Sequence, residues 1–199
     1  MADPPVLLVF AHPYPDRSRA NRKLLRAVEG LSGVAVRSLY DLYPNFDIDV
    51  STEQNALTSA SAVVWQHPMY WYSVPSLLKH WFDKVLVRGF AYGKGGEALW
   101  GKRCLWVVTT GGDSGAFSEQ GMHARPFEEF SPVVEQTARF CGMTWEDPLV
   151  LHGAHKVEEQ VLEAAALDYH TRLQQLVSSA RSSVSRSPVP PSPVPRSPV

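Results

Sequence analysis

Three segments of the chain combine polar, aromatic and glycine residues of the kinds that bind and react with small molecules. They are AHPYPDRSRAN at 11–21, HPMYWYSVP at 67–75 and TTGGDSGAFSEQGMHARP at 109–126. Each follows a short apolar run, so each is expected to leave the end of a β-strand. Because the carboxyl ends of parallel strands meet at one edge of a sheet, these three loops form the candidate site.

The first segment has the features of an anion site at the start of a helix. Ser18 is placed as an N-cap and Asn21 follows three residues later, while His12 and Arg19 could supply charge. The free amides of a first helical turn stabilise a phosphate without a large basic patch. The alternative is that Ser18 only caps its helix and His12 only ends a strand. A dinucleotide bound in the usual Rossmann manner is not expected, because the segment lacks G-x-G-x-x-G.

Aromatic side chains dominate the second segment. Tyr70, Trp71 and Tyr72 lie between Pro68 and Pro75, two residues that stiffen the flanks of the loop. Three rings close to backbone donors and acceptors suit a flat heteroaromatic ligand. The alternative is that the rings cover an edge of the core or form a subunit contact.

The third segment offers backbone amides and a histidine. Gly111 and Gly112 let the main chain approach a ligand closely, and their amides could bind developing negative charge. The reduced form of a flavin needs such donors, since hydride arrival leaves charge on the pyrimidine end of its ring. His123 could donate a proton to a quinone-like acceptor, or it could be an ordinary surface histidine.

Two other patterns carry less weight. The string GDSGA at 112–116 is also found around the nucleophile of serine proteases, but here it lies on a glycine-rich loop without evident acid and base partners. His152 and His155 have a metal-like spacing without an evident third ligand. We therefore expect no metal site and interpret both histidines as surface residues.

Short apolar runs alternate with amphipathic segments along the chain. The order strand, helix, strand predicts right-handed crossovers and a parallel sheet covered on both faces. The expected fold class is α/β, a three-layer doubly wound fold with a five-stranded parallel sheet. The predicted strands span residues 6–12, 34–40, 61–67, 104–110 and 144–152, and the predicted helices span about 18–30, 51–60, 75–87, 126–141 and 156–177.

The composition predicts one globular domain and a tail. The chain has 199 residues, of which 44% are hydrophobic and 20% charged, and residues 1–177 can build a sizeable core. Residues 178–199 are rich in proline and serine, so we expect a disordered, extended segment. An inert tail is favoured over a docking peptide for a groove.

Charge and hydropathy exclude several classes of protein. The net charge is -1, and setting aside the three arginines of the last 19 residues leaves 16 basic and 20 acidic residues, which argues against nucleic-acid binding. The longest apolar run, at 6–11, is far shorter than the roughly 20 residues that cross a bilayer. With no signal-peptide pattern and with Cys104 and Cys141 interpreted as reduced thiols, we expect a cytoplasmic protein.

Together and in this order, the segments resemble the flavodoxin-like NAD(P)H:quinone oxidoreductase family over residues 6 to about 176. The stretches AHPYPDRSRAN, RSLYDLYPNFDID, VVWQHPMYWYSVPSLLKHWFDKV, GFAYGKGGEALWGK and TTGG look most similar to the ancillary flavoproteins of bacterial glutathione-gated potassium-efflux systems. The resemblance implies that residues 1–177 form a flavodoxin-like flavin-binding domain. Its flavin would be FMN, as in the ancillary branch, or FAD, as in the larger quinone reductases.

The resemblance also assigns roles to individual residues. His123 matches the catalytic histidine of the larger reductases, but Phe117 stands where they have a tyrosine. A tyrosine–histidine relay is therefore not expected, and a single histidine or solvent would move the proton. The implied flavin-binding residues are His12, Ser18, Arg19, Ala20 and Asn21 for the phosphate, Pro68, Met69, Tyr70, Trp71 and Tyr72 for the ring, and Thr109, Thr110, Gly111 and Gly112 for its polar edge.

The implied activity is that of an NAD(P)H dehydrogenase (quinone). Two electrons pass as hydride from NAD(P)H through the flavin to a quinone, with both substrates using one site in turn, which predicts ping-pong kinetics. The resemblance further implies a homodimer. Two alternatives remain open. One is a regulatory flavoprotein subunit of a potassium-efflux transporter, peripheral on the cytoplasmic face of the inner membrane, and the other is a one-electron flavodoxin carrier.

Overall fold

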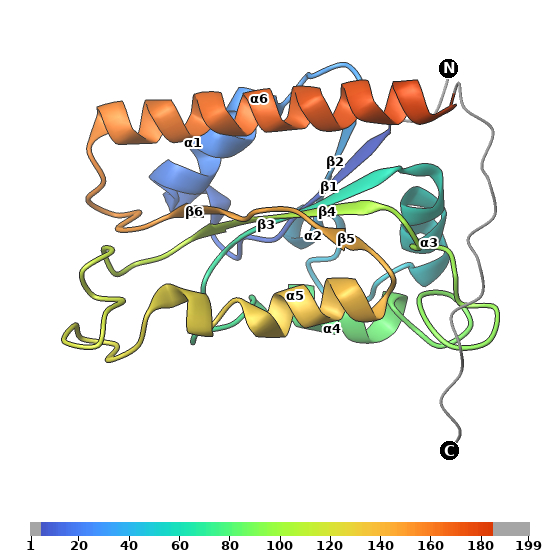
Figure 1. Cartoon of the computed structure of the whole chain (residues 1–199), viewed down its shortest axis with the longest axis horizontal. Coiled ribbons are helices and arrows are strands. Elements are labelled where there is room, and N and C mark those ends of the chain that lie inside the picture. The colour runs from blue at the N-terminus through green and yellow to red at the C-terminus, as the bar shows by residue number, and fades with distance from the viewer. Residues whose placement is uncertain (1–4, 185–199) are drawn as a thin grey trace.

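Six parallel strands form one twisted sheet in the computed structural model, which describes residues 5–184. The strand order is β2-β1-β3-β4-β5, and β6 also pairs with β4. Helices α1 and α6 cover one face of the sheet, while α4 and α5 lie against the other (Figure 1). The strands are β1 (Val6–Phe10), β2 (Val34–Ser38), β3 (Ala62–Pro68), β4 (Arg103–Thr109), β5 (Thr144–Trp145) and β6 (Leu149–Leu151).

The helices connect these strands in the predicted alternating order, which confirms the three-layer doubly wound fold. The chain crosses from one side of β1 to the other between β2 and β3, so the switch point lies between β1 and β3. The helices are α1 (Arg19–Val28), α2 (Leu39–Leu42), α3 (Val50–Ser59), α4 (Ser76–Val85), α5 (Pro132–Phe140) and α6 (Glu159–Val184), with 3₁₀ turns η1 (Pro15–Arg17) and η2 (Phe127–Glu129).

Burial follows the hydropathy of the strands. The sequence of β1 is entirely apolar, and every residue of β1 and β3 is buried, because helices cover both faces of the sheet at its centre. The more polar β2 is half-buried at the sheet edge, as the sequence predicts. The carboxyl ends of the buried strands are therefore held rigidly, and the loops of the candidate site begin there.

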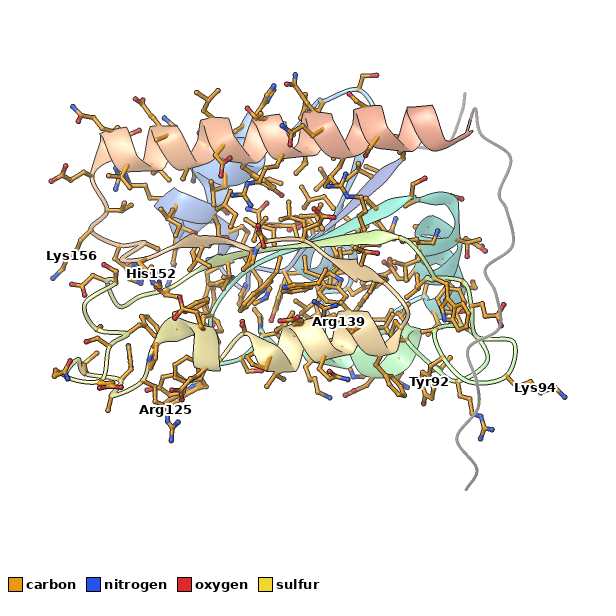
Figure 2. The ribbon with its side chains drawn as sticks, in the orientation of Figure 1. Tyr92, Lys94, Arg125, Arg139, His152 and Lys156 are labelled. Atoms are coloured by element: carbon orange, nitrogen blue, oxygen red, sulfur yellow. The ribbon has the colours of Figure 1, made fainter. Side chains whose placement is uncertain are left out.

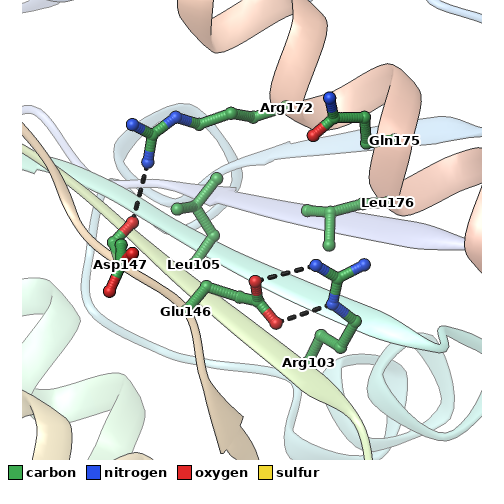
Figure 3. Close-up of a pocket in the computed structure, with 7 residues that line it drawn as sticks. All are labelled: Arg103, Leu105, Glu146, Asp147, Arg172, Gln175 and Leu176. Atoms are coloured by element: carbon green, nitrogen blue, oxygen red, sulfur yellow. Dashed lines mark hydrogen bonds and ion pairs between the residues drawn. The ribbon is translucent and has the colours of Figure 1, made fainter.

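The predicted fifth strand is divided into two. β5 pairs with Arg103 and Cys104, whereas β6 pairs with the last three residues of β4. Pro148 lies between them and has no N–H for the ladder. In the break, Glu146 accepts two hydrogen bonds from Arg103 at 2.6 and 2.7 Å, and Arg172 of α6 donates to the carbonyl of Asp147 (Figure 3). The sheet thus has five main strands and a sixth.

Helix α6 is longer than the sequence predicts. It continues to Val184, so residues 178–184, which we expected to be extended, are helical. The remainder of the proline-rich segment, 185–199, lies outside the described residues. Within 5–184, no helix is both long and apolar enough to cross a membrane.

A buried carboxylate joins β2 to the helices beside it. Glu53 of α3 is fully buried and accepts hydrogen bonds from Arg37 at 2.7 Å, from the hydroxyl of Tyr43 at 2.5 Å and from the indole of Trp81 at 2.9 Å. All three partners are donors, so the charge of Glu53 is compensated in an apolar layer.

We expect Glu53→Gln to lower the free energy of unfolding by about 3 kcal/mol, because the new amide group would face donors in a buried position and leave the partly buried Arg37 unpaired. Urea denaturation monitored by circular dichroism measures the change. Glu163→Gln is the control, since Glu163 forms an exposed ion pair with Lys23 and should change stability by less than about 0.5 kcal/mol. Equal effects of the two substitutions would contradict the role given to Glu53.

Candidate functional site

The three predicted loops meet at the carboxyl ends of β1, β3 and β4. Strand register places Phe10 beside Gln66 and Pro68 beside Thr109. Just past the strands, the amide of Ala11 donates to Gln66 at 2.9 Å and the amide of Met69 donates to Thr109 at 2.7 Å. The loops are therefore fixed to one another by main-chain hydrogen bonds.

Two adjoining cavities lie between these loops and share Met69, Thr110 and Gly111. All the predicted site residues except Ala20 line one cavity or the other. The first, of about 380 Å³, is lined by His12, Tyr14, Arg17, Ser18, Arg19, Asn21, Pro68, Met69, Tyr70, Thr109, Thr110, Gly111, Ala154 and His155. The second, of about 220 Å³, is lined by Met69, Trp71, Tyr72, Thr110, Gly111, Gly112, Phe117 and His123.

The start of α1 provides donors at one end of the first cavity. Ser18 caps the helix, and its Oγ accepts a hydrogen bond from the amide of Asn21 at 3.2 Å. The amides of Arg19 and Ala20 belong to the first turn and have no acceptor within the helix. Ala20 is buried, so its contribution to a ligand would be its amide alone. This end of the cavity suits an anion.

The positive charge that the sequence suggests at this end is largely absent. Arg19 donates to the carbonyl of Val157 at 2.6 Å and pairs with Glu159 at 2.5 Å, so its charge is compensated. His12 is buried, and burial first, then the nearby His155, lowers its pKa to about 4. Its Nδ1 accepts a hydrogen bond from the amide of Tyr14 at 3.0 Å. His12 is therefore neutral at neutral pH, and its N–H is at Nε2.

Asn21 has a different role from the one its sequence position suggests. Its side chain is buried, and Nδ2 donates a hydrogen bond to the hydroxyl of Thr109 at 2.7 Å. Its main-chain carbonyl accepts a hydrogen bond from the side chain of Gln66 at 3.1 Å. Its Oδ1 has no hydrogen-bond partner among the described residues. Asn21 thus joins α1 to β3 and β4 beneath the anion site, and its amide supports Ser18.

His67 supports the aromatic loop from below, a role that the sequence analysis missed. It is fully buried, its Nδ1 donates to the carbonyl of Pro68 at 2.9 Å, and its Nε2 accepts from the indole of Trp106 at 2.7 Å. Burial lowers its pKa to about 4. The neutral ring therefore fixes the backbone immediately before Met69. A histidine at a strand end is the available sequence signal, but its partners come from another strand.

The aromatic loop is a tight turn with unusual backbone angles. Tyr70 and Ser73 exchange two main-chain hydrogen bonds of 3.0 Å, and the residues between them, Trp71 and Tyr72, have φ of 49° and 61°. Positive φ at both central positions is typical of a type I′ turn, which favours Asn and Gly. Trp71 is 93% exposed and Tyr72 48% exposed, so neither ring belongs to the core.

Two histidines from the segment after β6 lie beside the glycine loop. His152 lies 3.0 Å from the hydroxyl of Thr110, which donates to the carbonyl of Gly112 at 2.7 Å, and its ring packs against Phe117. The interpretation of His152 as a surface residue is therefore wrong. Figure 2 shows it on the inner side of its loop, whereas Lys156 points outward. His155 is exposed, as expected, but it lines the first cavity.

The chemistry of the lining suits a flavin mononucleotide. Amides and a hydroxyl at the helix start can hold a phosphate, and Met69 and the aromatic rings could contact a flat ring system. The amides of Gly111 and Gly112 lie at the other end, where a polar edge would be bound.

Comparisons with known proteins agree with this arrangement. Residues 4–173 match the family described as flavodoxin-like fold. The chain is 49% identical over 168 residues to KefF of Salmonella arizonae, the ancillary protein of a glutathione-regulated potassium-efflux system, and the match covers 84% of this chain and 94% of that protein.

Two solved structures are similar at moderate identity. General stress protein 14 from Treponema denticola, in complex with FMN, is 33% identical with a TM-score of 0.81, covering 87% of this chain and 99% of that chain. An NADPH-quinone reductase from P. pentosaceus is 29% identical with a TM-score of 0.76, covering 84% of this chain and 96% of that chain.

The low pKa of His67 predicts that the protein loses stability in mild acid. Below a pH of about 6.5 the unfolded chain binds a proton at this histidine that the folded chain excludes until about pH 4. Lowering the pH through this window should therefore reduce the free energy of unfolding, by on the order of 3 kcal/mol for His67 alone.

Urea titrations at several pH values test this contribution. His67→Gln keeps a donor and an acceptor but does not titrate, so we expect a shallower dependence of stability on pH, by about one proton. Wild-type protein titrated under the same conditions gives the reference slope. An unchanged slope in His67→Gln would contradict the assignment.

Proposed function

Because this chain belongs to the flavodoxin-like fold family, we propose that it is a flavin-dependent NAD(P)H:quinone oxidoreductase that holds FMN in the two adjoining cavities. The observation that carries the proposal is that the two cavities adjoin. Together they extend from the free amides at the start of α1, past the aromatic turn, to the glycine loop. The relative that is an NADPH-quinone reductase and the relative in complex with FMN support it.

The residues of the first cavity would hold the cofactor. The hydroxyl of Ser18 and the amides of Arg19 and Ala20 bind its phosphate, and the neutral His12 adds a donor at Nε2. Met69 and the aromatic turn contact the ring, and the amides of Gly111 and Gly112 stabilise negative charge at its polar edge. When bound, the flavin accepts hydride from NAD(P)H and passes two electrons to a quinone.

The second cavity would receive the substrates. Its lining includes Trp71, Phe117 and His123, so it offers apolar walls and one group that can exchange a proton. NAD(P)H and the quinone would occupy it in turn, and His123 would act in the quinone half-reaction. We also propose a cytoplasmic homodimer, whose second subunit would cover the exposed ring of Trp71.

Absorption spectra and steady-state kinetics test the proposal. We expect purified protein to be yellow, or to become so with FMN, to be bleached by NAD(P)H, and to give parallel double-reciprocal lines. Intersecting lines would contradict the shared site. Folded protein that stays colourless in excess FMN or FAD, without a thermal shift, would overturn the whole proposal.

A matched pair of variants isolates the phosphate. Aspartate and asparagine are both good N-caps, so Ser18→Asp and Ser18→Asn should preserve α1. The carboxylate of Ser18→Asp would repel a phosphate, and we expect FMN to bind at least tenfold more weakly to this variant than to Ser18→Asn. Riboflavin, which has no phosphate, should bind the two variants alike, as fluorescence titration would measure.

A regulatory role is the second candidate. It is favoured by the 49% identity to an ancillary protein of a potassium-efflux system, which extends over 94% of that protein. We expect this chain to increase potassium flux through a glutathione-gated efflux transporter reconstituted in vesicles, and to sediment with those vesicles. Unchanged flux together with no sedimentation would contradict this role and leave the oxidoreductase proposal intact.

A further inference from the structure

A tyrosine and a histidine from two different loops meet in the second cavity. The hydroxyl of Tyr72, in the turn after β3, lies 3.2 Å from Nδ1 of His123, in the loop after β4. Their rings are 5.4 Å apart at an interplanar angle of 83°, so the histidine lies edge-on to the phenol. Both side chains line this cavity together with Gly111 and Gly112.

The histidine ring is held from its other sides by apolar contacts and a close backbone approach. Phe117 packs on it at a centroid distance of 4.3 Å. A β-carbon built on Gly112 would lie 2.8 Å from Nε2, so the ring occupies the space that the glycine leaves open. Nε2 is buried and has no hydrogen-bond partner among the described residues. The polar contact of the ring is therefore the one at Nδ1, with Tyr72.

The backbone has strained angles at Tyr72 and directly after His123. Tyr72 has φ of 61° and Ala124, directly after His123, has φ of 52°. Such conformations are unfavourable for L-residues, and strain of this kind is concentrated at functional sites. Phe130 stacks on Tyr72 at 5.2 Å and holds the phenol in place.

Tyr72 gives His123 a hydroxyl partner that Phe117, the other ring packed on this histidine, cannot provide. Position 117, beside the same histidine, is a buried phenylalanine. Phe117 packs against His123 but has no hydroxyl. Tyr72 brings a hydroxyl to the same histidine from a loop 51 residues away in sequence.

We propose that Tyr72 is the catalytic acid that protonates the quinone and that His123 resupplies its proton. This inference rests on the proposed function and adds a residue to it. Reduction of a quinone to a hydroquinone requires two electrons and two protons, and hydride from the reduced flavin provides both electrons and one proton.

The second proton comes from the pair. The O–H bond of Tyr72 breaks as a new O–H bond forms on the quinone oxygen, and the phenolate regains a proton from Nδ1 of His123. His123 takes up one proton from solvent for each proton that it gives to Tyr72, so charge and atoms balance over a turnover.

Single-turnover experiments with two acceptors test the step. Protein reduced anaerobically is mixed with a quinone, which needs the proton, or with ferricyanide, which takes electrons alone. We expect Tyr72→Phe and His123→Ala to slow reoxidation by the quinone at least tenfold, while reoxidation by ferricyanide stays within twofold of wild type. In Tyr72→Phe we expect a tyrosine at position 117, introduced as Phe117→Tyr, to recover much of the quinone rate.

A spectroscopic measurement that needs no turnover accompanies the kinetics. Nitrogen NMR of labelled histidines should show a changed Nδ1 signal for His123 in Tyr72→Phe, because its hydrogen-bond partner is removed. Tyr40→Phe, whose hydroxyl is near Ser76 outside both cavities, should leave that signal unchanged.

The outcomes separate the two proposals. A wild-type quinone rate in Tyr72→Phe would overturn the relay, as would equal slowing with both acceptors, which would indicate a displaced loop. An unchanged His123 signal would also overturn it. A wild-type protein that binds flavin but is not reduced by NAD(P)H would instead overturn the proposed function.

Discussion

A chain of buried hydrogen bonds holds the candidate site together. The hydroxyl of Tyr169 on α6 donates to Gln66 at 3.1 Å, Gln66 donates to the carbonyl of Asn21 at 3.1 Å, and Asn21 donates to Thr109 at 2.7 Å. The amide of Asn21 then donates to Ser18. Because all but the last of these bonds are buried, breaking one leaves a polar group without water, which costs more than the bond itself contributes. The helix start, β3 and β4 therefore keep one relative position.

This constraint explains how a chain with a nearly neutral, slightly acidic domain can hold an anion. The two cationic side chains that the sequence offers are not free charges, since Arg19 is paired with Glu159 and His12 is neutral at neutral pH. Arg17 also lines the first cavity, and the amide dipoles at the start of α1 add to its charge, but dipoles act only over short distances and in a fixed direction. A rigid attachment of α1 to the sheet therefore keeps these dipoles directed at the anion site.

The sequence predicts those parts of this arrangement that local patterns determine. The buried strands, the cap at Ser18 and the meeting of three loops follow from hydropathy and spacing. The direction of the Asn21 side chain does not, because a residue in the first turn can face a ligand or the sheet, and Thr109 decides this from 88 residues away. The same holds for His67, whose partner Trp106 lies on the next strand, and for the division of the fifth strand, where Pro148 ends one ladder and the pair between Arg103 and Glu146 fills the break.

The aromatic turn shows why the proposed role of Tyr72 could not be inferred from sequence alone. In the sequence, Phe117 argues against a tyrosine beside His123. Tyr72 is only one of three aromatic residues in a loop that is expected to contact a flat ligand. A type I′ turn built from Trp and Tyr directs Trp71 into solvent and Tyr72 toward His123, and this direction depends on positive φ angles that neither residue favours. His67 supports this backbone by fixing the carbonyl of Pro68 before the turn begins. A strained turn on a rigid strand end can therefore place a hydroxyl that flexible backbone would leave in water.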